Sequence, residues 1–239
     1  MSGRTGGKNA GAVGQCHIFG KKLRRIMATD TSLPHLKKEL ANSISHGFGI
    51  LFGIVSIPIL IAAASRTGST AAIVGTAIYG FSFLMVYTFS TLYHGFQQPE
   101  VKRVMKIIDH ISIYFLIAGS YTPFVLLFVY NTTGLVLLSL LWGLTVIGIF
   151  VKIYHTGKRE RLSTAVYVMM GCMLLPVANT FFAELSAPVV ALIVAGGVLY
   201  CIGVIFYLWR KFYYHHVVWH LFVLAASICH YAAILIAVS

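Results

Sequence analysis

Hydrophobic stretches of about 20 residues recur along this chain, and each is long enough to cross a bilayer as a helix. Of the 239 residues, 58% are hydrophobic and only 10% are charged, which is too apolar for a soluble globular domain. We therefore predict an all-α membrane protein, a bundle of seven transmembrane helices. The predicted spans cover residues 40–64, 73–93, 107–128, 133–151, 163–183, 188–208 and 216–238.

The connections between these spans are short, so residues 37–239 are predicted to form a single transmembrane domain. Residues 1–36 are rich in glycine and basic side chains, and we expect a disordered cytoplasmic tail. This tail has no apolar core of signal-peptide length, which predicts no cleaved signal. The four cysteines show no CxxC spacing, so neither a disulfide framework nor a thiolate metal site is predicted.

The basic residues indicate how the bundle is oriented. Every Lys and Arg except Arg66 lies in the N-terminal tail or in alternate connections, near residues 94–106, 152–162 and 209–211. The positive-inside rule then places the N-terminus in the cytoplasm and, after seven spans, the C-terminus outside. The net charge of +12 is thus an orientation signal, with a secondary attraction to anionic lipid headgroups. We expect a multi-pass plasma-membrane protein and no nucleic-acid partner.

Ionisable side chains within membrane spans are costly and mark functional sites by default. The predicted topology brings most of them to the cytoplasmic face. They are Glu39 and His46 in the first span, His94 at the end of the second, Asp109 at the start of the third, and His216 and His220 at the start of the seventh. The uncharged polar residues Asn42 and Ser90 lie one turn before His46 and His94.

The spacing of these residues says which side chains can meet. Residues four apart share a helix face, so His216 and His220 can point at one ion, and Ser90 and His94 can share a pocket. Three imidazoles with an open fourth position are typical of catalytic zinc, which activates water near neutral pH. Asp109 can then hold that water or act as a general base, while Ser90 orients water or binds a substrate carbonyl.

Each histidine alone has a simpler explanation. A histidine at a span end can extend into the headgroup region, as we expect for His110, His155 and His215. His230 follows His220 by ten residues, about 15 Å along a helix axis, which is too far to bind the same ion. We expect it to form a hydrogen bond within the bundle. Several polar side chains nevertheless agree in their helical spacing, their depth in the membrane and the side of the membrane they lie on. This agreement favours a functional site.

The segments ELANSISHGFG, STLYH, DHISIYFLIAGSYTPF and HHVVWHLFVLAASICHYAAI resemble the hemolysin III-like bacterial branch of the progestin and adipoQ receptor superfamily. The resemblance extends from Glu39 to the end of the chain and implies a seven-helix fold with a cytoplasmic N-terminus. In the similar adiponectin receptors and alkaline ceramidases, three motif histidines bind zinc, and an Asp and a Ser flank the metal-bound water.

Carried over to this chain, the resemblance implies Zn²⁺ ligands at His94, His216 and His220, with Asp109 and Ser90 as the catalytic groups. It assigns structural support around the ligands to the motif residues Glu39, Asn42 and His46.

Two functions remain open from the sequence. The first is a zinc-dependent hydrolase that acts on an amide or ester of a membrane lipid near the cytoplasmic face. The second is a non-enzymatic sensor or receptor in membrane homeostasis, in which zinc ties the spans together. A toxin or channel fits less well, because no excreted amphipathic segment is present.

The orientation can be tested with reporter fusions. A reporter after Ser239 should be found outside the cytoplasm, and one inserted in the 155–160 loop should be found inside. The opposite result would place the predicted ligands at the outer face of the membrane.

Overall fold

The computed structural model of the protein describes residues 32–157 and 160–239, and these ranges hold helices and no strand. The elements are α2 (Leu33–Arg66), α3 (Thr70–Gly95), α4 (Pro99–Phe128), α5 (Thr132–His155), α6 (Glu160–Gly171), the 3₁₀ helix η1 (Leu175–Val177), α7 (Ala178–Phe182), α8 (Ala187–Leu208) and α9 (His215–Ala237).

Seven helical segments in these ranges are long and apolar enough to cross a membrane, α6, η1 and α7 together forming the fifth. The predicted fold class is therefore confirmed, whereas the sides of the membrane on which the termini lie stay a prediction. Residues 1–31 of the predicted tail lie outside the described residues.

The helices extend beyond most predicted span ends. α2 begins at Leu33 and α4 at Pro99, each with a proline in its first turn. Proline suits this position because the first turn has no partner for its N–H groups and the ring presets a helical φ. The added turns are polar, so hydropathy alone leaves them out of the predicted spans.

The fifth span is broken rather than continuous. α6 ends at Gly171, and the chain continues through η1 and α7. Pro176 explains the break, because its ring would clash with the carbonyl group of Cys172 in a regular helix and it has no N–H to donate. The hydroxyl group of Tyr121 in α4 donates to the freed carbonyl of Gly171 at 2.6 Å. The Tyr121 hydroxyl thus provides the hydrogen bond that this backbone carbonyl group could not obtain from lipid.

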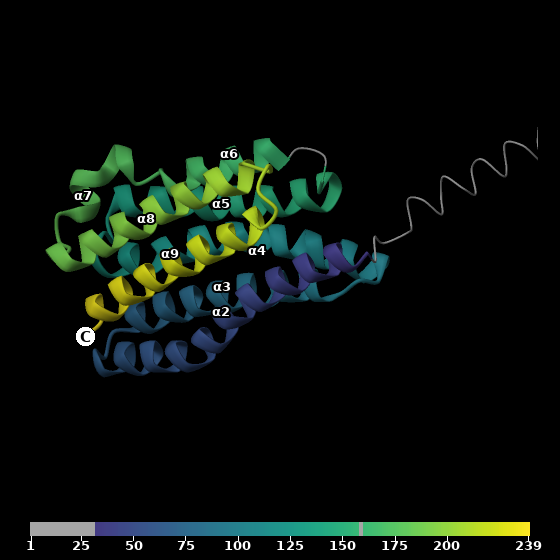
Figure 1. Cartoon of the computed structure of the whole chain (residues 1–239). Helices are drawn as coiled ribbons and strands as arrows, with labels where there is room; N and C mark the ends of the chain where they lie inside the picture. The colour runs from purple at the N-terminus through teal and green to yellow at the C-terminus, as the bar shows by residue number, and fades with distance from the viewer. Residues whose placement is uncertain (1–31, 158–159) are drawn as a thin grey trace, which may run out of the picture.

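The helices run side by side (Figure 1). Most pack mainly against their neighbours in sequence, whereas α6 packs against α4 and α8. In addition α2 packs against α9, which brings the first and last spans together. The start of α2, the end of α3 and the start of α9 all lie toward the same end of the bundle. The polar residues of these three segments therefore meet at one end, as the predicted topology requires.

Tyrosine hydroxyl groups join the helices in the interior. Tyr79 in α3 donates to the carbonyl group of Ser227 in α9 at 2.9 Å, and Tyr87 donates to the Ser227 hydroxyl at 2.9 Å. The hydroxyl group of Tyr200 in α8 reaches the same Ser227 oxygen at 2.8 Å. Such hydrogen bonds help membrane helices associate, because lipid provides no hydrophobic driving force between them.

Gly49 in α2 packs directly against the ring of Tyr87 in α3. A Cβ atom there would lie 2.2 Å from the ring of Tyr87, whereas a Cβ at Gly47, two residues earlier, would meet nothing within 4 Å. Gly49→Ala should therefore lower the melting temperature in detergent, because overpacking costs about 1–3 kcal/mol. Gly47→Ala is the matched control and should be neutral or slightly stabilising. Equal melting temperatures for the two variants would contradict this packing.

Candidate metal centre

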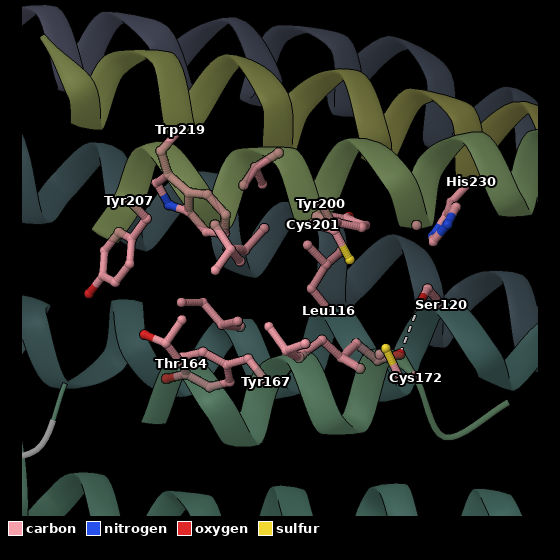
Figure 2. A pocket seen from close by; sticks show the side chains of 18 of the residues that line it. Leu116, Ser120, Thr164, Tyr167, Cys172, Tyr200, Cys201, Tyr207, Trp219 and His230 are labelled. Atoms are coloured by element: carbon pink, nitrogen blue, oxygen red, sulfur yellow. Dashed lines mark hydrogen bonds between the residues drawn. The ribbon is translucent and has the colours of Figure 1, made fainter. Parts of the chain in front are cut away.

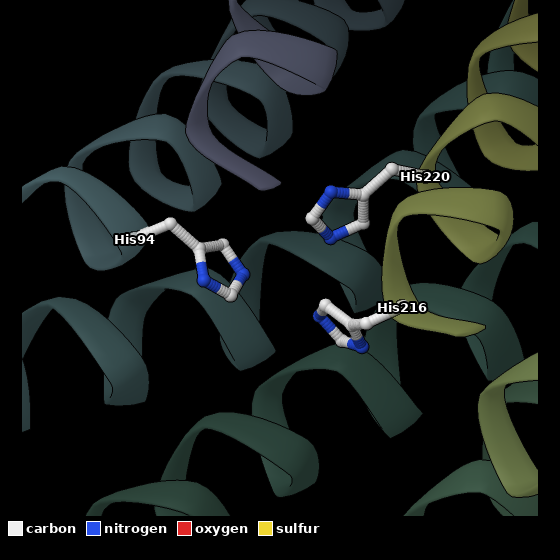
Figure 3. A group of neighbouring side chains, drawn as sticks. All are labelled: His94, His216 and His220. Atoms are coloured by element: carbon white, nitrogen blue, oxygen red, sulfur yellow. The ribbon is translucent and has the colours of Figure 1, made fainter. Parts of the chain in front are cut away.

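Three histidine side chains meet at this end of the bundle. His94 lies in the last turn of α3, and His216 and His220 lie in the first two turns of α9. One ring nitrogen from each lies within 4.8 Å of the others. Figure 3 shows the three rings facing one another from the two helices. The structure thus brings together the three predicted ligands, in an arrangement that can hold a metal ion.

Hydrogen bonds orient the ring of His220. The Ser45 hydroxyl donates to the carbonyl group of Asn42 at 2.7 Å, so its lone pairs remain to accept from His220 Nδ1 at 2.9 Å. The Asn42 carbonyl also lies 3.2 Å from this nitrogen. The proton therefore belongs on Nδ1, and Nε2 presents a lone pair. Metal-binding histidines are commonly held in this way.

His94 is oriented in the same manner. Its Nδ1 lies 3.4 Å from a carboxylate oxygen of Glu39, which also accepts from Lys102. Its Nε2 is buried without a hydrogen-bond partner in the described residues. A buried polar atom without a partner needs an explanation. His94 and His220 thus each present an Nε2 lone pair, because their Nδ1 atoms contact other side chains. Together with the nearby imidazole of His216, they fit the nitrogen ligands that zinc prefers.

The other residues of the predicted site lie close by. Asp109 in α4 and Ser90 in α3 are both buried, and the Ser90 side chain neighbours the Asp109 carboxylate. His46 in α2 is 3% exposed, and its ring centroid is 3.7 Å from that of His220. Neither ring nitrogen of His46 has a hydrogen-bond partner among the described residues. Its ring packs on a candidate ligand.

A cavity of about 530 Å³ begins at these residues and continues between α4, α6, α8 and α9. Ser90, Asp109, His216 and His220 form part of its wall, and most of the remaining lining is apolar. Figure 2 shows part of the cavity lining, with Tyr207 and Trp219 toward one end and His230 toward the other. The site thus opens into a chamber suited to an elongated apolar ligand.

The remaining histidines lie elsewhere. His155 is exposed, and His215 Nδ1 contacts the Phe206 carbonyl group at 3.2 Å. His230 Nε2 makes a long contact of 3.4 Å with the Ile193 carbonyl group, within the bundle as predicted. The expectation for His110 was wrong, because this residue is half-buried in the cavity wall. α4 begins two turns before the predicted span, so His110 lies deeper than the hydropathy pattern indicates.

Sequence reasoning missed two residues of this region. Ser45 supports His220, and its spacing of three from Asn42, on the same helix face, was a usable signal. Lys152 was assigned to a basic cytoplasmic connection, yet it lies in α5 and is buried at 3% exposure in the cavity wall. Its position at the end of an apolar run gave no sign of burial.

The fold and the site define a multi-pass helical membrane protein with a candidate three-histidine metal centre. The family model described as haemolysin-III related matches residues 34–231, and the chain belongs to this family. The resemblance predicted from the motifs is thereby confirmed.

Relatives span most of the chain. It is 40% identical to Hemolysin-3 of Bacillus cereus over 192 residues, which cover 80% of this chain and 88% of that protein. It is 42% identical to the Hemolysin-3 homolog of Bacillus subtilis (strain 168), covering 80% and 90%. The human monocyte to macrophage differentiation factor is 26% identical over 228 residues, covering 90% and 93%.

The metal centre can be tested by metal analysis. The purified protein should carry about one zinc ion per chain, and replacing His94, His216 or His220 by alanine should sharply lower this content because each removes one of three ligands. His155→Ala is the control and should leave the zinc content near normal. An equal loss in the control would show that the ligands have been wrongly chosen.

Proposed function

We propose that the protein is a zinc-dependent hydrolase of a lipid amide or ester, acting near the cytoplasmic face of the plasma membrane. One observation carries the proposal: a single cavity has Ser90, Asp109, His216 and His220 in its wall and an apolar chamber beyond them. The ring of His94 lies next to those of His216 and His220. The chamber can hold an acyl chain while the carbonyl group at its end lies against the polar residues.

His94, His216 and His220 would hold the zinc ion. When bound, zinc supplies a Lewis acid that polarises a carbonyl group and makes water acidic enough to attack at neutral pH. The open side of the site favours this role, because structural zinc is usually enclosed by four protein ligands.

In this mechanism a protein side chain carries out the proton transfers. The Asp109 carboxylate takes a proton from the attacking water and delivers it to the nitrogen or oxygen of the leaving group. The Ser90 hydroxyl orients this carboxylate or donates to the substrate carbonyl oxygen. Glu39 and Ser45 keep the rings of His94 and His220 in place through their Nδ1 atoms. Hydrolysis then releases a fatty acid and an amine or alcohol.

A second candidate is a non-enzymatic sensor of membrane state with structural zinc. One observation favours it: the candidate ligands lie on α3 and α9, and their supporting partners lie on α2. A metal ion there would join α3 and α9 directly, and the hydrogen bonds from α2 would add a third helix to the cluster. The large cavity beside the ligands favours the hydrolase over this alternative.

Asp109→Asn separates the two functions, because it keeps the shape of the side chain but removes the base. In a hydrolase the variant should retain zinc and melting temperature, yet lose hydrolysis of a responsive lipid amide or ester by about 10²–10⁴-fold. Glu100→Gln, which changes an exposed carboxylate on the same helix, should keep full activity. Product fatty acid is measured by mass spectrometry across a panel of such lipids.

With a purely structural metal, loss of a ligand histidine should lower the melting temperature, while Asp109→Asn leaves complementation of a deletion phenotype intact. An Asp109→Asn protein with normal zinc, normal stability and full lipid turnover would refute the hydrolase mechanism.

A further inference from the structure

Lys152 is the most buried charged side chain in the described part of the protein, at 3% exposure against 8% for Asp109 and 9% for Glu39. It lies in the last turn of α5 and forms part of the cavity wall, as do Asp109 and Glu160. Burying an ammonium group at the end of a membrane span is costly unless a counter-charge or several hydrogen bonds compensate it.

Within the described residues, the hydrogen bond and the ring contact of Lys152 are both with neutral groups. Its Nζ donates to the Ser163 hydroxyl at 2.7 Å and lies 5.6 Å from the centroid of the Tyr167 ring. An ammonium group has three N–H donors. The ion pairs found among residues 32–157 and 160–239 do not include Lys152.

The nearest acidic side chains do not balance this charge. Glu160 accepts from Lys106 at 3.4 Å and from Arg210 at 2.7 Å, so its carboxylate is already shared by two cations. Asp109 is the other carboxylate in this part of the cavity wall. Among the described residues, three cationic side chains therefore share two carboxylates, and Lys152 is the one of these cations that lines the cavity. The apolar wall screens the charge of Lys152 poorly, so an anion in the cavity would be attracted to it.

The position of Lys152 in its helix offers a purely structural explanation. The last turn of α5 carries partial negative charge on its free carbonyl groups, which stabilises a cation there. A cationic side chain that points into solvent from the last turn would gain the same stabilisation. It does not account for an ammonium group in the wall of a cavity that also holds the candidate site.

We propose that Lys152 binds a carboxylate or phosphate on the headgroup of the lipid whose acyl chain occupies the cavity. This inference rests on the proposed function only in assuming that the cavity takes a lipid. It narrows the substrate class to acyl amides or esters with an anionic headgroup, of which an N-acyl amino acid is the simplest amide.

Two amides with the same acyl chain test this directly. N-oleoylglycine carries a carboxylate where N-oleoylethanolamine carries a neutral hydroxymethyl group. Binding to the purified full-length protein in detergent is measured by displacement of a fluorescent fatty-acid probe. Because hydrogen bonds to charged groups are worth more than neutral ones, N-oleoylglycine should bind about tenfold more tightly or better.

Variants then assign the preference to Lys152. Lys152→Gln should bind the two amides equally, and Lys152→Arg should restore most of the preference for N-oleoylglycine. Arg210→Gln is the matched control, because it removes an exposed cation from the same group and should keep the preference. The melting temperature of each variant is measured alongside.

The outcomes are distinct. Equal binding of both amides to the unaltered protein overturns this inference and leaves the hydrolase proposal standing, whether or not Lys152→Gln folds. If neither amide displaces the bound probe, this inference fails, whereas the hydrolase proposal is decided by turnover across the lipid panel. Binding of N-acetylglycine as tight as that of N-oleoylglycine would show a site for small free anions, contrary to the lipid headgroup proposed. A folded Lys152→Gln protein that keeps the preference overturns the role of Lys152.

Discussion

The hydrogen bonds that hold the ring of His220 are the constraint on which the candidate site depends. A neutral imidazole at the end of a membrane span needs partners, and Ser45 with the Asn42 carbonyl group provides them from α2. This contact fixes the register of α9 against α2. His216, one turn earlier on α9, then faces the ring of His94 on α3, which Glu39 of α2 orients in turn. The same few polar contacts thus determine how α2, α3 and α9 pack against one another.

The other helices build the chamber rather than the centre. α6 makes only limited contacts with α4 and α8, and the cavity lies where closer packing would otherwise be. The break at Pro176 shortens α6, and Tyr121 compensates the freed backbone carbonyl groups. The bundle therefore combines a well-packed part, which carries the polar ligands, with a more open part that can admit an apolar chain. A cluster of polar side chains and an open apolar chamber make different demands on packing, and different helices meet them.

Much of this could be predicted from the sequence. The apolar runs revealed all seven spans, and the basic residues predicted a topology that gathers the polar groups at one end. The spacing of His216 and His220 predicted that both rings face one point. These features follow from the bilayer and from helical periodicity, which act locally along the chain.

The remaining features depend on how helices pack together. The role of Ser45 arises from contact between α2 and α9, which are 175 residues apart in sequence at this pair. The burial of Lys152 depends on how α6 packs near the end of α5, where the Ser163 hydroxyl accepts a hydrogen bond from the Lys152 ammonium group. The cavity is a property of the space between four helices, and no local pattern encodes its volume.

X-ray absorption at the zinc edge of the purified, unaltered protein tests the central claim most directly, since it reports the atoms around the metal without any substitution. We predict a zinc ion with three imidazole nitrogens at about 2.0–2.1 Å and an additional oxygen ligand. A sulfur ligand at about 2.3 Å, a spectrum without imidazole scattering, or a protein that binds no zinc would contradict it.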